Sequence, residues 1–189
     1  NLPGIDYFVD NSRKSHIFDI VSAHLEGEIM DPLTLPPDSF GYQLGFQSLH
    51  TRATVKIQDG CDNFCTFCII PYARGNSRSI AARDVVEKAR KLVSNGFREI
   101  VLTGVDIGDY GRDLCGCPSL ARLIEMIFDQ IPNLTRLSLS SIDPIELNSE
   151  LIDLLANEKR LMPHLHLSVQ SGDDLILKRM KRRHSRSDV

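Results

Sequence analysis

The chain has 189 residues, of which 42% are hydrophobic and 25% charged, as in an ordinary soluble globular protein of one domain with at most a small appendage. A formal net charge of −3 gives no overall attraction to nucleic acid, although residues 178–186 (KRMKRRHSR) contain six Lys or Arg and no acid. Such a run usually forms a solvated helix face. No run of about 18 apolar residues and no secretory signal is visible, so we predict a cytoplasmic protein without a membrane span.

The first 50 residues contain too few predicted elements to form a domain of their own. Residues 5–9 (IDYFV) are typical of a short strand, and apolar residues at helical spacing predict a helix over 14–25. One strand and one helix cannot bury a core, so we interpret residues 1–25 as the C-terminal tail of a preceding α/β domain. The chain also lacks an initiator Met, which suggests a piece of a longer polypeptide. Residues 26–50, rich in Pro and Gly, predict a linker, and an ordered arm laid over the next domain remains the alternative.

A group of cysteines follows the first well-defined strand. The β-branched run over 54–57 predicts a buried strand, and Asp59-Gly60 ends it because glycine accepts the positive φ of a tight turn. Cys61, Cys65 and Cys68 come next with CxxxCxxC spacing. Three thiolates are one short of a structural zinc site, but they suit a 4Fe–4S cluster with one iron open to a cofactor or substrate.

Two other interpretations of these cysteines stay open from spacing alone. They could bind zinc with a further ligand from His164, His166, Cys115 or Cys117, or they could bind no metal. The odd count of five cysteines, without an export signal, favours metal or redox chemistry over a disulfide framework. Phe67, directly before the third cysteine, favours the cluster because it offers a flat cofactor ring an apolar wall.

Strands and helices alternate in the rest of the chain. Buried strands are predicted over 99–103, 137–141 and 165–169, and helices over 79–95, 119–131, 149–158 and from 173 onward. This alternation predicts a parallel sheet with right-handed crossovers, in which ligands bind at the carboxyl ends of the strands. The residues that follow the later strands should therefore lie at the same edge of the sheet as the cysteines: Thr103, Gly104, Asp106, Ser140, Ser141, Gln170 and Ser171.

The cysteine spacing, Cys61-xxx-Cys65-x-Phe67-Cys68, resembles the radical S-adenosylmethionine (SAM) motif. Four longer strings resemble the methylthiotransferases, in particular the branch that modifies threonylcarbamoyladenosine in tRNA: IQDGCDNFCTFCIIPYARGNSRS, EIVLTGVDIGDYG, LSLSSIDP and PHLHLSVQSGDDLILKRMKRR. The resemblance extends from about Thr51 to the C-terminus, and a weaker resemblance covers residues 1–25. It implies an α/β fold: a partial parallel (β/α) barrel of the radical SAM type, with four βα units over residues 51–189, truncated before the last units of the family.

The resemblance also implies roles for individual residues. The three cysteines would bind a 4Fe–4S cluster, and SAM on the open iron would be cleaved to methionine and a deoxyadenosyl radical. Phe67 would lie near the adenine. Thr103, Gly104 and Asp106 stand where the superfamily binds the methionine amino group, although the usual Gly-Gly-Glu is absent. Hydrogen bonds to the ribose or the carboxylate would come from Ser140, Ser141, Gln170 and Ser171. No catalytic residue beyond the cluster ligands is implied.

The implied enzyme adds a methylthio group to carbon 2 of N6-threonylcarbamoyladenosine, next to the anticodon of tRNA, with a reducing partner such as flavodoxin or ferredoxin. The sulfur would come from a second cluster in the preceding domain, and no cysteine stands before Cys61. Arg74, Arg78 and Arg183 could contact RNA phosphate or pair with acids. The alternatives are isopentenyladenosine in tRNA or a ribosomal protein as the substrate, or a zinc-stabilised RNA-binding module without catalysis.

Overall fold

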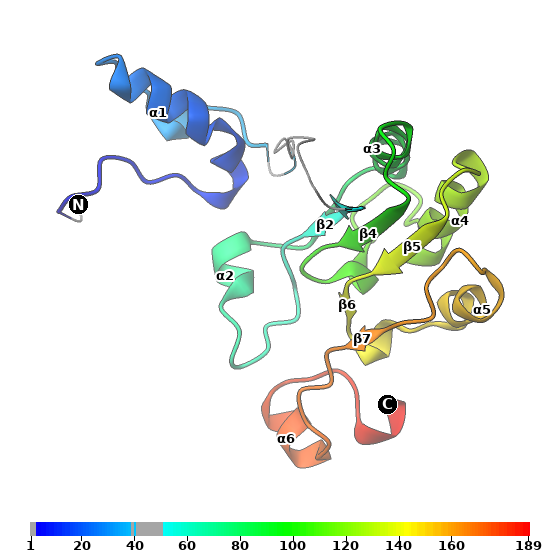
Figure 1. The fold of residues 1–189 in the computed structure, drawn as a ribbon. Helices are drawn as coiled ribbons and strands as arrows, with labels where there is room; N and C mark the ends of the chain where they lie inside the picture. Colours follow the sequence, from blue (N-terminus) through cyan, green and yellow to red (C-terminus); the bar gives the residue numbers. More distant parts are fainter. Residues whose placement is uncertain (1–2, 39, 41–50) are drawn as a thin grey trace. The chain divides into compact units, whose positions relative to one another are not determined.

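The computed structural model describes residues 3–38, 40 and 51–189, and the chain divides into two compact units, Asn1–Gln47 and Ser48–Val189 (Figure 1). The first unit contains a 3-10 helix, Asn11–His16, the helix α1, Ile17–Leu25, and a second 3-10 helix, Pro32–Thr34. The predicted helix is confirmed. The strand predicted over 5–9 is wrong, because no described segment of this unit pairs with it and a lone strand leaves its backbone groups unpaired.

Part of the segment predicted as a linker packs on the first unit instead. Arg13 Nε donates to the Leu35 carbonyl at 2.8 Å, and Ser15 Oγ donates to the Asp38 carbonyl at 3.2 Å. The rest of the predicted linker, residues 39 and 41–50, lies outside the described residues. The proposed domain boundaries therefore stay a prediction.

The second unit is built on a three-stranded parallel sheet. Its strands are β1 (Arg52–Lys56), β4 (Glu99–Thr103) and β5 (Arg136–Leu139), in the order β1-β4-β5. Alternate residues of each strand are buried and line up across the sheet in two rows: Ala53, Ile100 and Leu137, then Val55, Leu102 and Leu139. Helices α3 (Ala82–Ser94) and α4 (Leu120–Gln130) contact each other, and their buried apolar stripes complete this core (Figure 1).

Shorter elements extend the sheet at the carboxyl ends of its strands. The parallel pair β6 (Ser141–Ile142) and β7 (His166–Leu167) continues from β5, and β2 (Gln58–Asp59) pairs antiparallel with β3 (Arg78–Ser79). The remaining α-helices are α2 (Ile70–Arg74), α5 (Ser149–Asn157) and α6 (Asp174–Arg179). Further 3-10 helices span Ile107–Asp109, Pro144–Glu146 and Arg186–Asp188.

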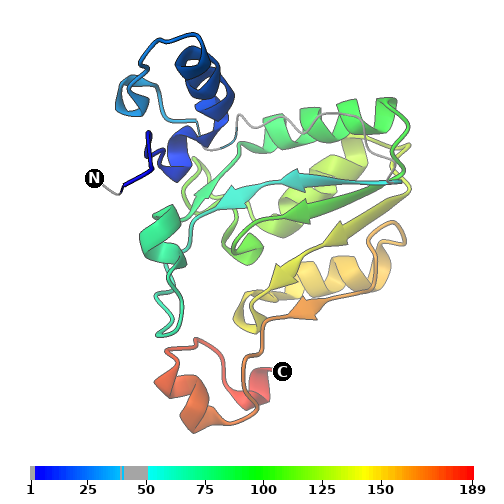
Figure 2. The same ribbon diagram turned by 60° about the vertical axis from the view of Figure 1, so that its left-hand side comes forward.

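The structure confirms the predicted α/β fold with a partial parallel barrel. Figure 2 shows the strands pointing toward the side on which α2 and the C-terminal segment lie. The fourth strand is shorter than predicted, because only His166 and Leu167 pair with β6. Helix α6 ends at Arg179, so the interpretation of residues 178–186 as a helix face is wrong. Among the described residues, no helix is long and apolar enough to cross a membrane.

Candidate metal and cofactor site

The three cysteines lie on the segment between β2 and α2, residues 60–69, here called the cysteine loop, and a buried glutamine of β2 precedes it. The Gln58 side-chain oxygen accepts hydrogen bonds from the backbone N–H groups of Val105 and Asp106, at 3.0 and 2.8 Å. Its amide nitrogen donates to the Gly60 carbonyl at 2.8 Å. Gln58 therefore fixes the start of the cysteine loop against the loop after β4. We did not predict this role, although a lone polar side chain after a β-branched run is a detectable signal.

The next residue, Asp59, is a fully buried carboxylate surrounded by three cations. Lys56 Nζ lies at 2.6 Å, Arg74 Nη1 at 3.0 Å and Arg78 Nη2 at 3.3 Å from its oxygens. A buried charge requires this pairing, since desolvation alone would favour the neutral acid. Arg74 and Arg78, predicted to contact RNA, thus have a structural partner, and their RNA contact stays a prediction.

Gly60 lets the loop turn sharply into the first cysteine, as predicted. Its φ is +77°, a conformation that side chains other than glycine adopt only with strain. A Cβ atom here would also collide with the backbone carbonyl of Asn76. The turn therefore needs glycine for two independent reasons.

The three cysteines are free thiols on one loop. Cys65 is buried, whereas Cys61 and Cys68 are partly exposed. Burial raises the pKa of Cys61 to about 11, and the nearby Asp106, Cys65 and Cys68 act in the same direction. The loop carries strain, because Phe64 has a φ of +46°. A metal centre at this loop would bind the cysteines as thiolates, so its binding would release their protons.

The positions of the possible ligands allow a single zinc ion to be compared with a 4Fe–4S cluster at the three cysteines. In the described part of the chain, no three Cys, His, Asp or Glu side chains gather tightly enough to hold a single metal ion. A zinc ion needs four donors around one point, so the zinc interpretation gains no support. In a 4Fe–4S cube each thiolate binds a different iron, so three neighbouring free thiols suffice as its donor set.

Asp106 lies beside the cysteines, as the strand pattern predicts. The thiol of Cys61 donates to Asp106 Oδ2 at 3.8 Å, and Asn63 Nδ2 donates to the same oxygen at 2.7 Å. The Asp106 side chain is 8% exposed. Gly104 lets the loop after β4 approach β2, because a Cβ atom there would come within 2.9 Å of the Gln58 carbonyl.

The other predicted cofactor contacts differ in their surroundings. Ser140 Oγ is buried and has no hydrogen-bond partner, which suits a group that meets a ligand. Ser141 Oγ lies 2.6 Å from His166 Nδ1, and Ser171 Oγ accepts from the backbone of Asp173 at 3.1 Å. Gln170 is exposed with a φ of +67°. The remaining predicted contacts are Phe67, which is 55% exposed, and Thr103 at the end of β4.

The C-terminal segment supplies charged groups that sequence reasoning missed. Arg182 Nη2 lies 2.9 Å from Asp143 Oδ2, and both side chains are almost fully buried. The two ring nitrogens of His184, also buried, lie 3.2 Å from Asp143 Oδ1 and 3.0 Å from the Val169 carbonyl. The expectation that this basic run is solvated is therefore wrong for Arg182 and His184. The string LSSIDP contains their partner, but no local pattern links the two segments.

The neighbouring Arg183 pairs with acids. Its guanidinium contacts Glu146, and lies 3.7 Å from Asp143 and 3.9 Å from Asp106. Burial, together with the nearby Asp106, raises the pKa of Glu146 to about 8 although Arg183 opposes the shift. The guanidinium of Arg183 therefore has carboxylates as partners. The RNA contact predicted for Arg183 remains a prediction.

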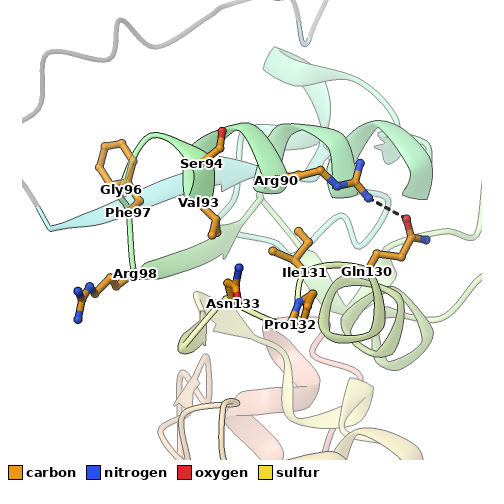
Figure 3. Close-up of a pocket in the computed structure, with 10 residues that line it drawn as sticks. All are labelled: Arg90, Val93, Ser94, Gly96, Phe97, Arg98, Gln130, Ile131, Pro132 and Asn133. Carbon is orange, nitrogen blue, oxygen red and sulfur yellow. Dashed lines mark hydrogen bonds between the residues drawn. The ribbon is translucent and has the colours of Figure 1, made fainter.

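A separate pocket lies at the opposite, amino ends of the strands (Figure 3). It is lined by the ends of α3 and α4 and by the turns that follow them, from Val93 to Arg98 and from Gln130 to Asn133. Arg90 Nη2 donates to Gln130 Oε1 at 3.0 Å across it. The amino ends of strands in such folds serve stability, so we do not assign the chemistry to this pocket.

Comparison with known proteins gives matches along the whole chain. Residues 55–189 match the Radical SAM superfamily. A threonylcarbamoyladenosine tRNA methylthiotransferase, MtaB, of Rickettsia prowazekii is 44% identical over 191 residues, covering 100% of this chain and 45% of that protein. A tRNA-2-methylthio-N(6)-dimethylallyladenosine synthase of Carboxydothermus hydrogenoformans is 42% identical, covering 98% of this chain and 40% of that protein. The chain thus spans less than half the length of these relatives.

A solved structure shares the fold. The radical S-adenosylmethionine methyltransferase TsrM from Kitasatospora setae, solved with cobalamin and a [4Fe-4S] cluster bound, has a TM-score of 0.57 and 17% sequence identity. The match covers 71% of this chain and 26% of TsrM. At this identity the likeness concerns the arrangement of strands and helices.

Proposed function

Since the chain belongs to the radical SAM superfamily, we propose that it is the cofactor-binding part of a tRNA methylthiotransferase. The observation that carries this proposal is the group of three free thiols, placed by a buried polar framework at the carboxyl ends of parallel strands. Two kinds of tRNA methylthiotransferase are more than 40% identical to nearly the whole chain. The zinc-stabilised RNA-binding module has no comparable support.

The residues present fit a 4Fe–4S cluster and SAM. Cys61, Cys65 and Cys68 would bind the cluster, which when bound supplies the electron that cleaves the sulfonium of SAM. Asp106 would accept hydrogen bonds from the ammonium of the methionine moiety, a role supported by the position of its buried carboxylate beside Cys61. The unpartnered Ser140 Oγ would bond to a polar group of SAM. Further contacts are proposed for Phe67, Thr103, Gly104, Ser141, Gln170 and Ser171.

The proposed substrate is N6-threonylcarbamoyladenosine next to the anticodon of tRNA, methylthiolated at carbon 2. Support comes from five relatives named for this activity, from Rickettsia prowazekii, Bacillus subtilis, Chlamydia pneumoniae, Thermotoga maritima and Aquifex aeolicus. The dimethylallyladenosine synthases are also similar to the chain, so the isopentenyl-type adenosine is the second candidate.

We further propose tRNA and a reductant such as flavodoxin or ferredoxin as partners, in the cytoplasm where tRNA is modified. Two exposed aromatic side chains offer surfaces for a nucleobase to stack on: Phe64 between the first two cysteines, which is 48% exposed, and Tyr72 on α2, which is 76% exposed. The two rings pack edge-on, with 5.7 Å between their centroids. Arg74 follows on the same helix, partly exposed and already paired with Asp59.

Two measurements test the proposal. Anaerobic reconstitution of the chain should give a brown protein with about four irons and four sulfides, which cleaves SAM when reduced. Mass spectrometry of tRNA nucleosides from a strain without the encoding gene should show loss of the methylthio group from threonylcarbamoyladenosine. Loss from the isopentenyl-type adenosine would select the second substrate, and colourless protein with one zinc would overturn the proposal.

A further inference from the structure

One arginine of the C-terminal segment reaches the cysteine loop directly. Arg182 Nη1 donates to the sulfur of Cys65 at 3.5 Å, although the two residues are separated by 117 positions. The same side chain donates through Nη2 to the Ser168 carbonyl at 2.7 Å and pairs with Asp143. One guanidinium thus joins the cysteine loop, the segment after β7 and the segment after β6.

The backbone of the same segment also holds the loop. Thr66 N donates to the Met180 carbonyl at 3.2 Å, and Thr66 Oγ1 donates to the Arg179 carbonyl at 3.3 Å. Thr66 lies directly after Cys65. Residues 179–182 therefore form a wall of the cysteine loop on the side of the buried Cys65.

The burial of Arg182 needs a reason. Its side chain is 7% exposed, and its Nε is buried without a hydrogen-bond partner. Taking a guanidinium out of water is costly, and its pairing with Asp143 offsets that cost only in part. A surface arginine could hold the backbone of this segment equally well. The burial is explained if the charge itself is needed beside Cys65.

From these contacts we propose that Arg182 is a positioning residue for the cluster, whose hydrogen bond to Cys65 Sγ raises the cluster's reduction potential. This inference rests on the proposed function. Reduction adds negative charge to the cluster, and a cationic donor to a ligating sulfur stabilises that charge. The planar guanidinium fork reaches Cys65 through Nη1 and both Ser168 and Asp143 through Nη2, whereas lysine would present its three donors from a single nitrogen. Asp143 holds the fork in place.

The test uses three variants of the 189-residue chain, reconstituted without oxygen. Arg182→Gln removes the charge, and Arg182→Lys keeps the charge without the fork. Arg179→Gln is the matched control, because Arg179 is exposed and meets the loop through its backbone carbonyl. Iron and sulfide are counted first. The midpoint potential is then measured by dithionite titration, followed by electron paramagnetic resonance of the reduced cluster.

We expect four irons in all proteins, and in Arg182→Gln about a tenfold lower ratio of reduced to oxidised cluster at a fixed potential. For a one-electron couple this is a shift of about −59 mV. Arg182→Lys should shift less, and Arg179→Gln should not shift. An unchanged potential in Arg182→Gln with four irons would overturn the inference and leave the proposed function intact.

Two further outcomes also test the inference. If Arg182→Gln does not fold by circular dichroism, the neutral variant Arg182→Met takes its place, and an unchanged potential in Arg182→Met with four irons overturns the inference. A wild-type chain that takes up no iron overturns the proposed function and this inference with it.

Discussion

The two ends of the parallel sheet differ in what they bury. At the amino ends, short turns lead from α3 to β4 and from α4 to β5 around a pocket with an exposed Arg90–Gln130 hydrogen bond. At the carboxyl ends, long loops carry buried polar groups. All six buried polar or charged residues in the described part of the chain belong to β2, to these loops or to the segment that packs on them: Gln58, Asp59, Asp106, Asp109, Asp143 and His184.

This asymmetry separates scaffold from site. A buried polar group costs free energy unless it is fully bonded, so a fold without a function at one end has no reason to concentrate such groups there. The same strands and helices run from one end of the sheet to the other. The difference therefore lies in the loops, and variants at matched positions of the two ends should differ in a predictable order.

The largest effect should come from the cysteines. Cys65→Ala removes a donor from the proposed cluster, so we expect iron after reconstitution to fall from about four to well under one per chain, with SAM cleavage lost. The double variant Cys115→Ala/Cys117→Ala changes two exposed thiols of the loop after β4 and should keep the iron. Equal iron loss in both proteins would contradict the assignment of the three-cysteine loop.

The next effect should come from the buried carboxylate. Asp59→Asn removes the negative charge that three cations share, and we expect it to lower the free energy of unfolding by about 3 kcal/mol. Arg90→Gln at the amino end removes an exposed hydrogen bond and should cost less than about 0.5 kcal/mol. Urea denaturation of both variants gives the comparison, and similar losses would remove the distinction between the two ends.

A smaller difference should separate two glycines. Gly60 and Gly96 both have positive φ, +77° and +94°, but a Cβ at Gly60 meets the Asn76 carbonyl while a Cβ at Gly96 meets nothing within 4 Å. Gly96→Ala should cost about 1 kcal/mol for the backbone conformation alone. Gly60→Ala adds the collision and should cost roughly 2–3 kcal/mol. Thermal unfolding of the two variants measures this, and a larger loss at Gly96 would refute the close approach at Gly60.

The scaffold was more predictable from sequence than the site. Residues 99–103 form β4 as predicted, since a run of buried β-branched and aliphatic residues between turn signals fixes a strand locally. The sequence signal failed over 5–9, where the pattern suits a strand but no partner pairs with it in the described chain. Local patterns therefore predict elements well when the partner is close.

The polar groups of the site escaped prediction for a different reason. Arg182 and His184 stand in a run that is typical of a solvated face, and only their pairing with Asp143, about 40 positions earlier, makes their burial possible. Pairings of this kind depend on which strand ends meet. Asp106 was placed correctly because the parallel topology itself brings the ends of neighbouring strands together.

A pH dependence of stability is expected from a single buried acid at the carboxyl ends. The pKa of Glu146 is raised from its ordinary 4.5 to about 8 by burial and by Asp106, so the folded state holds this proton more tightly than the unfolded chain. Stability should then fall as pH rises from about 4.5 to about 8, because the unfolded chain loses this proton at a lower pH than the folded protein does. Glu146→Gln, which has no proton to lose, should flatten this fall in the unfolding midpoint measured by circular dichroism. Glu150→Gln, at an exposed position on α5, should leave the wild-type slope, and a slope that survives in Glu146→Gln would place the responsible group elsewhere.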